Sequence, residues 1–147
     1  MQEAWLEELD TEECIVLLKG EVVGRIAFVH EGLPVVLPVN YHLLETPTGI
    51  VLTLRTRPGG PIDRAPRAVA LEIDGIDHSR QRGWSVLVRG SLRHLAARDN
   101  ELQEHFRVVP WLPAEPDVWL VIEPVEISGR RLQAATVEWA FRAGGYL

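Results

Sequence analysis

The chain has 147 residues, the size of one domain, with 46% hydrophobic and 24% charged residues, a composition typical of soluble globular proteins. Its formal charge of −6 at pH 7 disfavours binding to nucleic acid or to an anionic membrane, both of which favour a basic surface. No apolar run reaches the roughly 20 residues of a membrane span, and the single cysteine excludes an intrachain disulfide. Because the N-terminus shows no export signal, we expect a cytoplasmic protein with a single domain over residues 1–147.

The first predicted element is a helix over about residues 10–19. Asp10 can accept a hydrogen bond from a free amide of the first turn, and Glu13 follows three residues later. We expect the helix to stop at Gly20, where a left-handed conformation costs little. Cys14 and the leucines that follow share one apolar face, which predicts a helix lying on a sheet.

Stretches rich in β-branched residues follow, separated by short turns that contain glycine and proline. This spacing predicts an antiparallel meander rather than alternating strands and helices. The predicted strands are residues 23–29, 34–41, 50–56, 69–74, 84–95 with a bend at Gly90, and 118–127, with a further piece at 131–133. We therefore expect a mostly β protein with short helices, in which about six strands close into a barrel that leaves few exposed edges.

The segments between the strands are assigned by composition. They are one helical turn at 62–65, a polar loop at 75–83, a short helix at 99–106, an irregular stretch at 110–113 and a C-terminal tail over about 134–147.

Several families of chemistry have no motif here. The five histidines lack metal-ligand spacing such as H-E-x-x-H, and one cysteine cannot build a zinc site, so no metal centre is expected. No serine stands in a G-x-S-x-G elbow, and neither G-x-G-x-x-G nor a Walker loop occurs. The residues therefore name no catalytic acid, base or nucleophile.

Positive charge is concentrated in one short stretch of this acidic chain. The stretch holds one acid, Asp63, among the arginines Arg55, Arg57, Arg64 and Arg67. Such charges are ordinarily those of a solvated loop, but two features favour a ligand. Arg55 and Thr56 end a buried-looking strand, and the glycines that follow let backbone amides approach a ligand before a helical turn. Guanidinium, hydroxyl and free amides together would form a cradle for a phosphate.

Polar residues also end two other predicted strands, at Asn40 and at Trp84-Ser85. A barrel that gathers these ends has a polar, anion-tolerant rim around an apolar wall. Such a rim suits a flat, phosphorylated cofactor.

These segments carry a resemblance to a known family. The chain resembles the pyridoxamine 5′-phosphate oxidase-like, FMN-binding split-barrel proteins over roughly residues 9–133. The matching motifs, in order, are Glu13-Cys14, Val23-Gly24-Arg25-Ile26-Ala27-Phe28, Pro38-Val39-Asn40, Leu54-Arg55-Thr56, Val69 to Asp74, Gly83 to Gly90, Pro110-Trp111 and the pattern Trp119, Ile122, Pro124, Ile127, Gly129-Arg130. The resemblance implies a six-stranded antiparallel split β-barrel, a homodimer, and an FMN-dependent oxidoreductase whose flavin lies at the dimer interface.

The resemblance also assigns roles to residues. Arg55 and Thr56 would hold the flavin phosphate, and Pro38-Val39-Asn40 would lie along the isoalloxazine ring. Thr53 would lie near the pyrimidine side of the ring or near the ribityl chain. The cradle would add the guanidinium of Arg57 and the backbone at Gly60.

Three tryptophan and serine positions complete the expected site. Trp84 and Ser85 would close the pocket from the next strand, and Trp111 would reach in from the partner subunit. The substrate is not named by any of these residues.

One position departs from the family pattern. Where such proteins commonly have a phosphate-binding lysine, two residues past the loop glycine, this chain has Pro61. A nearby arginine, Arg57 or Arg64, is placed to replace that charge. The departure keeps two alternatives open: a reductase that uses a deazaflavin, and a non-enzymatic module that binds a flavin or haem, or no ligand.

Overall fold

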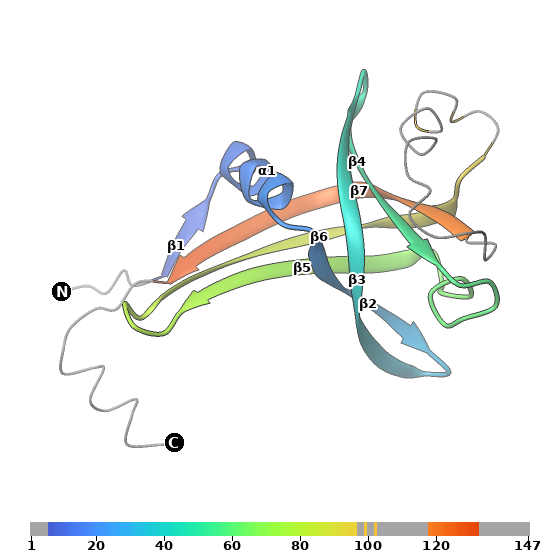
Figure 1. Cartoon of the computed structure of the whole chain (residues 1–147), viewed down its shortest axis with the longest axis horizontal. Helices are drawn as coiled ribbons and strands as arrows, with labels where there is room; N and C mark the ends of the chain where they lie inside the picture. The colour runs from blue at the N-terminus through green and yellow to red at the C-terminus, as the bar shows by residue number, and fades with distance from the viewer. Residues whose placement is uncertain (1–5, 97–98, 100–101, 103–117, 133–147) are drawn as a thin grey trace.

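The computed structural model describes residues 6–96, 99, 102 and 118–132. In this part of the chain one helix accompanies a single antiparallel sheet of seven strands (Figure 1). The elements are β1 (Leu6–Leu9), α1 (Thr11–Gly20), β2 (Val23–His30), β3 (Leu33–Thr46), β4 (Gly49–Thr56), β5 (Ala68–Asp77), β6 (Arg82–His94) and β7 (Val118–Leu132).

Six of the strands close into a ring. The sheet runs β1-β7-β4-β3-β2-β5-β6, and β6 pairs back onto β7, so β2 to β7 form a closed barrel. The predicted six-stranded antiparallel barrel is therefore confirmed. β1 is a short seventh strand that the sequence did not reveal; it pairs with β7 outside the ring, from Leu6 opposite Leu132 to Leu9 opposite Gly129.

Helix α1 begins as the sequence predicts and ends differently. The backbone N–H of Glu13 donates to the Asp10 carboxylate at 2.8 Å, which satisfies one free amide of the first turn. The expected left-handed end at Gly20 is wrong: Gly20 belongs to the helix, and Glu21 ends it in an extended conformation, φ −115° and ψ 159°. An extended conformation is favoured at Glu21 because β2 begins only two residues later, at Val23.

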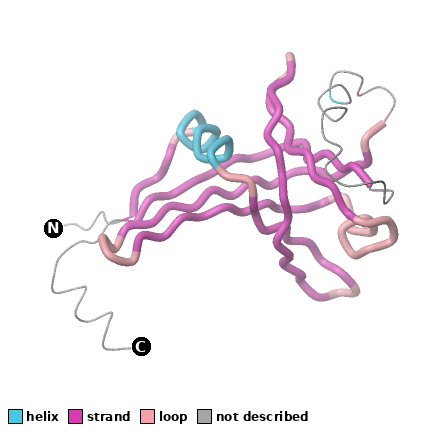
Figure 2. Tube along the Cα trace, in the orientation of Figure 1, coloured by secondary structure: helices cyan, strands magenta, loops and turns pink. Residues whose placement is uncertain are grey.

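The barrel interior is filled by side chains from every strand of the ring. Ile26, Leu52, Leu71, Val86 and Ile122 are fully buried. Helix α1 packs against β3, β6 and β7 (Figure 2) and buries Cys14 and Leu18 there. The hydroxyl of Tyr41, which is 1% exposed, donates to the Leu18 carbonyl at 2.6 Å and so joins β3 to the helix.

The predicted polar loop over 75–83 is wrong. Strand β5 continues to Asp77 and β6 begins at Arg82, so the turn is confined to residues 78–81. Gly75 is required by packing instead: a Cβ there would lie 2.6 Å from the ring of its cross-strand partner Trp84. The Asp77 carboxylate accepts hydrogen bonds from the amides of Ser79 and Arg80, both at 3.1 Å, and thereby forms the turn.

The last two predicted strand pieces are one strand, β7, which spans both. The predicted irregularity at Gly90 is confirmed as a register shift between Arg89 and Gly90. A Cβ at Gly90 would lie 2.3 Å from the Glu123 carbonyl oxygen, so only glycine allows β6 and β7 to approach here. The predicted short helix at 99–106, apart from Asp99 and Leu102, lies outside the described residues, as do the segment 110–113 and the tail.

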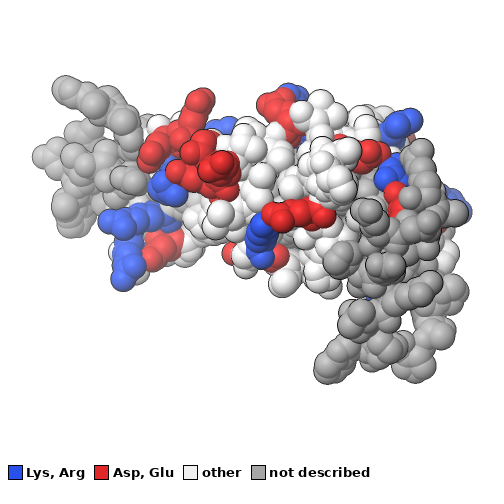
Figure 3. Space-filling view, turned by 90° about the horizontal axis from the view of Figure 1, so that it is seen from above, with Lys and Arg blue, Asp and Glu red and all other residues white. Residues whose placement is uncertain are grey.

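Charged side chains form opposite-sign groups on the outer surface. On the face shown in Figure 3, acidic and basic groups lie next to one another in several places, separated by uncharged surface. The pairs include Arg25 with Glu72 and Asp74, at 3.0 and 2.6 Å, and Arg89 with Glu126. Exposed pairs of this kind add little to stability, about 0–1 kcal/mol each. The described helix is too short and too polar to cross a membrane.

Candidate ligand site at the ends of β3 and β4

A pocket of about 480 Å³ lies over β3, β4 and the start of β7. We call it the β4 pocket. Seven of the residues expected at the cofactor site line it: Pro38, Val39, Asn40, Thr53, Arg55, Thr56 and Arg57. Sequence reasoning did not foresee four others that also line it: His42, Leu54, Ile62 and Trp119.

Strand pairing explains why residues from distant segments meet here. Strands β3 and β4 form a hairpin in which Tyr41 lies opposite Leu54, so Asn40 and Arg55 flank the same end. On the other side of β4, Arg55 lies opposite Trp119 of β7. Val39, Thr53 and Leu54 are buried and give the pocket a firm floor, whereas Asn40 and Arg55 are exposed.

The Arg55 guanidinium lies over the Trp119 ring, with its Cζ 5.7 Å from the ring centroid. A cation over a tryptophan face is attracted by the ring quadrupole, by about 0.5–1 kcal/mol at exposed sites. The contact holds the guanidinium at the Trp119 side of the β4 pocket. A planar fork held in this way can bind a phosphate or carboxylate through two parallel hydrogen bonds.

The loop after β4 is organised by internal hydrogen bonds. Gly59 has φ +76°, and the Gly60 N–H donates to the Arg57 carbonyl at 3.3 Å, the pattern of a turn with Pro58 second and glycine third. The Gly59 N–H donates to the Asp63 carboxylate at 2.7 Å. The expectation that these amides are free for a ligand is therefore wrong, and Gly60 does not line the β4 pocket. The predicted helical turn is present as a single turn, with Arg64 N–H bonded to the Gly60 carbonyl at 3.1 Å.

Asp63 connects this loop to the end of β6. Its second carboxylate oxygen lies 2.6 Å from Nε2 of His94, and its side chain is only 18% exposed. The Gly59 amide, and next the His94 ring, hold the pKa of Asp63 below its usual value. Asp63 is therefore ionised at neutral pH, and it stands at the amide where the sequence predicted a ligand phosphate.

Trp84 and Ser85, which the sequence also predicted for the cofactor site, do not line the β4 pocket either. Trp84 lies opposite Arg131 in the β6–β7 pairing, whereas Arg55 lies opposite Trp119. From Trp119 to Arg131 is twelve residues along β7, roughly 40 Å of strand. Ser85 follows Trp84 and is equally distant, and Trp111 lies outside the described residues. In one copy of the chain, Trp84 and Ser85 cannot close the β4 pocket.

The described residues show no cluster of three or more histidine, cysteine or acidic side chains that could hold a metal ion. The pocket instead offers guanidinium, hydroxyl, amide and aromatic groups above an apolar floor. These are the groups of a site for a flat ligand that carries an anionic tail.

The closed six-stranded ring and the pocket at its strand ends place the chain among the small split β-barrels with a pocket of ligand size. Residues 10–131 match the pyridoxamine 5′-phosphate oxidase family, and the chain belongs to this family. The Mycobacterium tuberculosis protein Rv0080 is 31% identical over 134 residues, which are 86% of each chain.

Solved structures share the fold. The FAD-binding protein of Mycobacterium smegmatis has a TM-score of 0.72 and 27% identity, over 87% of this chain and 99% of that one. An FAD-binding protein of Mesorhizobium loti has a TM-score of 0.66 and 26% identity, over 87% and 99%. Both relatives are matched over almost their whole length.

Proposed function

We propose that the chain is a flavin-dependent oxidoreductase that binds FMN in the β4 pocket. The phosphate lies against Arg55 and Thr56, and the isoalloxazine ring lies along Pro38, Val39 and Asn40. The bound flavin supplies the electron transfer, and the protein supplies binding, orientation and electrostatics.

The position of the Arg55 guanidinium is the main observation that supports this proposal. The guanidinium lies over Trp119 at the end of a buried strand, in a pocket that Thr56 also lines and whose floor includes the buried Val39 and Leu54. A phosphate needs a charged fork and a hydroxyl, and a flavin ring needs an apolar surface. Both requirements are met by described residues within this one pocket.

FAD is a second candidate for the cofactor, because two relatives at 26% and 27% identity are FAD-binding proteins. FAD carries a second phosphate and an adenosine. Arg57, which is exposed at the rim of the pocket, is placed to meet that second phosphate.

We further infer that two copies associate and enclose the flavin between them. In one copy the pocket is open, since Pro38, Asn40, His42 and Arg55 are all exposed. Exclusion of water would strengthen the electrostatic contact between Arg55 and a bound phosphate. A second copy would provide this cover.

The test of the proposal is a comparison of FMN with riboflavin, which lacks the phosphate. In Arg55→Ala, FMN affinity should fall roughly ten- to a hundredfold, because a charge-assisted contact is worth about 1.5–3 kcal/mol. Riboflavin should bind Arg55→Ala and wild type alike. FAD, titrated in parallel, identifies the cofactor by its affinity relative to FMN.

Arg80→Ala is the matched control, because Arg80 is an exposed arginine in the distant β5–β6 turn. It should bind FMN as tightly as wild type. Equal FMN affinities of wild type and Arg55→Ala would show that the phosphate is bound elsewhere.

A further inference from the structure

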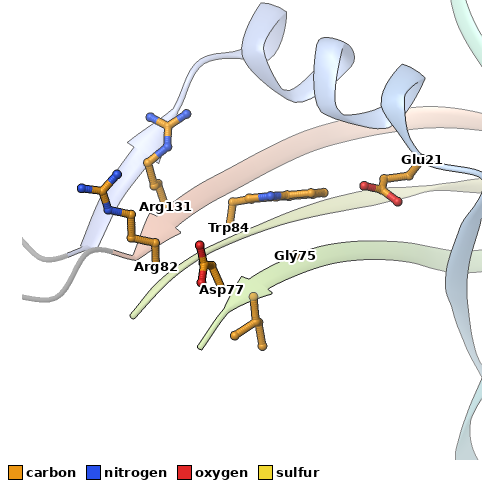
Figure 4. A pocket seen from close by; sticks show the side chains of 8 residues that line it. Glu21, Gly75, Asp77, Arg82, Trp84 and Arg131 are labelled. Atoms are coloured by element: carbon orange, nitrogen blue, oxygen red, sulfur yellow. The ribbon is translucent and has the colours of Figure 1, made fainter. Parts of the chain in front are cut away.

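A second pocket, of about 630 Å³, lies at the far end of the barrel from the β4 pocket. We call it the Trp84 pocket. Its lining includes Glu21, Gly75, Asp77, Arg82, Trp84 and Arg131 (Figure 4). A volume of several hundred cubic ångströms is that of an ordinary small-molecule site.

The Trp84 pocket continues the inner face of the barrel. Side chains two residues apart share one face of a strand, so Trp84 and Arg82 lie on the same face of β6 as the buried Val86 and Val88. The apolar interior therefore passes through Trp84 to a charged rim. Barrel mouths with an apolar floor and a polar rim are preferred sites for small ligands.

The floor of the pocket is aromatic. Trp84 lies across Gly75 so closely that a Cβ at Gly75 would be 2.6 Å from the indole nitrogen. The glycine lets the ring lie flat on β5, and the half-buried ring lines the pocket above it. A flat ring held in this way can stack on a planar ligand, a contact worth about 0.5–1.5 kcal/mol beyond the buried area.

Two arginines and one carboxylate stand on opposite sides of that floor. Arg131 lies opposite Trp84 on β7, and Arg82 lies two residues before Trp84 on β6. Glu21, which ends helix α1, lies beyond the other edge of the Trp84 ring (Figure 4). The pocket is therefore polarised along the plane of the ring.

The arginines are only partly neutralised. Asp77 lies opposite Arg82 and the two charges attract each other, but the Asp77 carboxylate is also shared with the turn, where it accepts from the Ser79 hydroxyl at 2.7 Å and from two amides. Arg82 forms no ion pair within 4 Å in the described part of the chain. Arg131 has a partner in Glu7 of β1, at the long distance of 3.7 Å.

We propose that the Trp84 pocket is a binding site for a planar aromatic anion: the ring stacks on Trp84, the acidic group binds Arg82 and Arg131, and a ring donor points to Glu21. The site is separate from the β4 pocket, since roughly 40 Å of strand lies between them in one copy. It does not depend on the proposed flavin function.

Indole-3-carboxylate is a suitable probe, because it has a flat ring, a carboxylate and an N–H donor. Calorimetric titration should show that it binds wild type, and that the neutral indole-3-carboxamide binds at least about tenfold more weakly, the loss of about 1.4 kcal/mol. Arg82→Gln and Arg131→Gln should each weaken the binding of indole-3-carboxylate by a similar factor. High salt should weaken this binding too.

Arg80→Gln is the matched control, because Arg80 lies two residues from Arg82 but outside the pocket. It should bind the probe as wild type does. Trp84→Phe keeps an aromatic floor and should bind, whereas Trp84→Leu should not. The proposal would be overturned if Trp84→Leu no longer bound indole-3-carboxylate while Arg82→Gln and Arg131→Gln bound it as tightly as wild type.

FMN titrations of the same variants separate the two sites. We expect FMN affinity to fall with Arg55→Ala and to be unchanged in Arg82→Gln, with the opposite pattern for indole-3-carboxylate. If Arg82→Gln weakens FMN and Arg55→Ala does not, the Trp84 pocket is the flavin site and the proposal is wrong. Equal binding of the carboxylate and the carboxamide to wild type would also overturn it.

Discussion

At the scale of single residues, Asp63 changes how the site recognises an anion. The Gly59 amide, which the sequence predicted to meet a phosphate, already donates to Asp63 at 2.7 Å. Pro61 leaves no lysine at the family's usual position. An anion bound in the β4 pocket, as we propose, would therefore meet the side chains of Arg55, Thr56 and Arg57.

The effect of the His94 contact on the pKa of Asp63 is expected to be measurable in a pH titration. Asp63 has a lowered pKa in the folded chain, so its bonds to Gly59 and His94 stabilise the fold above its unfolded pKa of about 3.9. That stability is lost as the pH falls through the folded pKa. In His94→Ala the pKa of Asp63 should rise towards its usual value, because the ring that bonds to the carboxylate is gone. Side-chain NMR titration of the aspartates measures this directly.

Asp77 provides the internal control, since its pKa is also lowered, by Ser79 and Arg80 in a distant turn. It should titrate identically in wild type and in His94→Ala. An unchanged pKa of Asp63 in that variant would show that the 2.6 Å contact with His94 does not lower the pKa of Asp63.

Much of the β4 pocket could be predicted from the sequence, because strand ends and motif order mark its residues. Seven of the expected residues share the pocket, although their role towards a cofactor stays a prediction. Trp119 was missed because only the pairing of β4 with β7 brings it beside Arg55. The bond from Gly59 to Asp63 was missed because sequence shows an amide but not which acceptor reaches it first.

At the scale of elements, periodicity and turn residues located the strands well. Two glycines were misinterpreted, for different reasons. Gly75 was interpreted as the start of a loop, yet it is inside β5 beneath Trp84, a contact across the sheet that a local pattern does not contain. Gly20 was interpreted as a left-handed end, yet it is helical, because the extended Glu21 ends the helix instead.

The junction of α1 with β3 should respond to alkaline pH. Burial, and next the charge of Glu21, raise the pKa of Tyr41 to about 12. An unfolded tyrosine titrates near pH 10, so about 2–3 kcal/mol of stability is present below pH 10 and is lost as the pH rises towards 12. Tyr41→Phe should be less stable than wild type near pH 8 by about 1–3 kcal/mol, because the Leu18 carbonyl loses its donor.

Urea unfolding of both proteins between pH 8 and pH 12 measures this effect. The difference in unfolding free energy between wild type and Tyr41→Phe should shrink as the pH rises, because only wild type has the ionisable phenol. Glu21→Gln should retain most of the effect, because burial rather than Glu21 is the larger cause. A constant difference across the range would contradict the raised pKa.

At the scale of the whole molecule, the surface of one copy is unusually apolar near the β2–β3 hairpin. Val29 is 57% exposed and Val36 60%, and the pairing of β2 with β3 places them on the same face of the hairpin. Contiguous apolar surface of this kind usually marks an interface, and two-fold self-association is its commonest form. The core of the closed barrel is filled by other residues, so these side chains stay exposed to solvent in a single copy.

We therefore expect a homodimer. Light scattering during size exclusion should give a mass about twice the 16.5 kDa of one chain at micromolar concentration. Val36→Lys places a charge in the apolar hairpin surface and should shift the mass towards one chain, whereas Val16→Lys, on the exposed side of α1, should not. FMN affinity should fall together with dimer mass in Val36→Lys if, as we propose, the second copy covers the open β4 pocket. A wild-type monomer that binds FMN tightly would show that one copy makes the whole site.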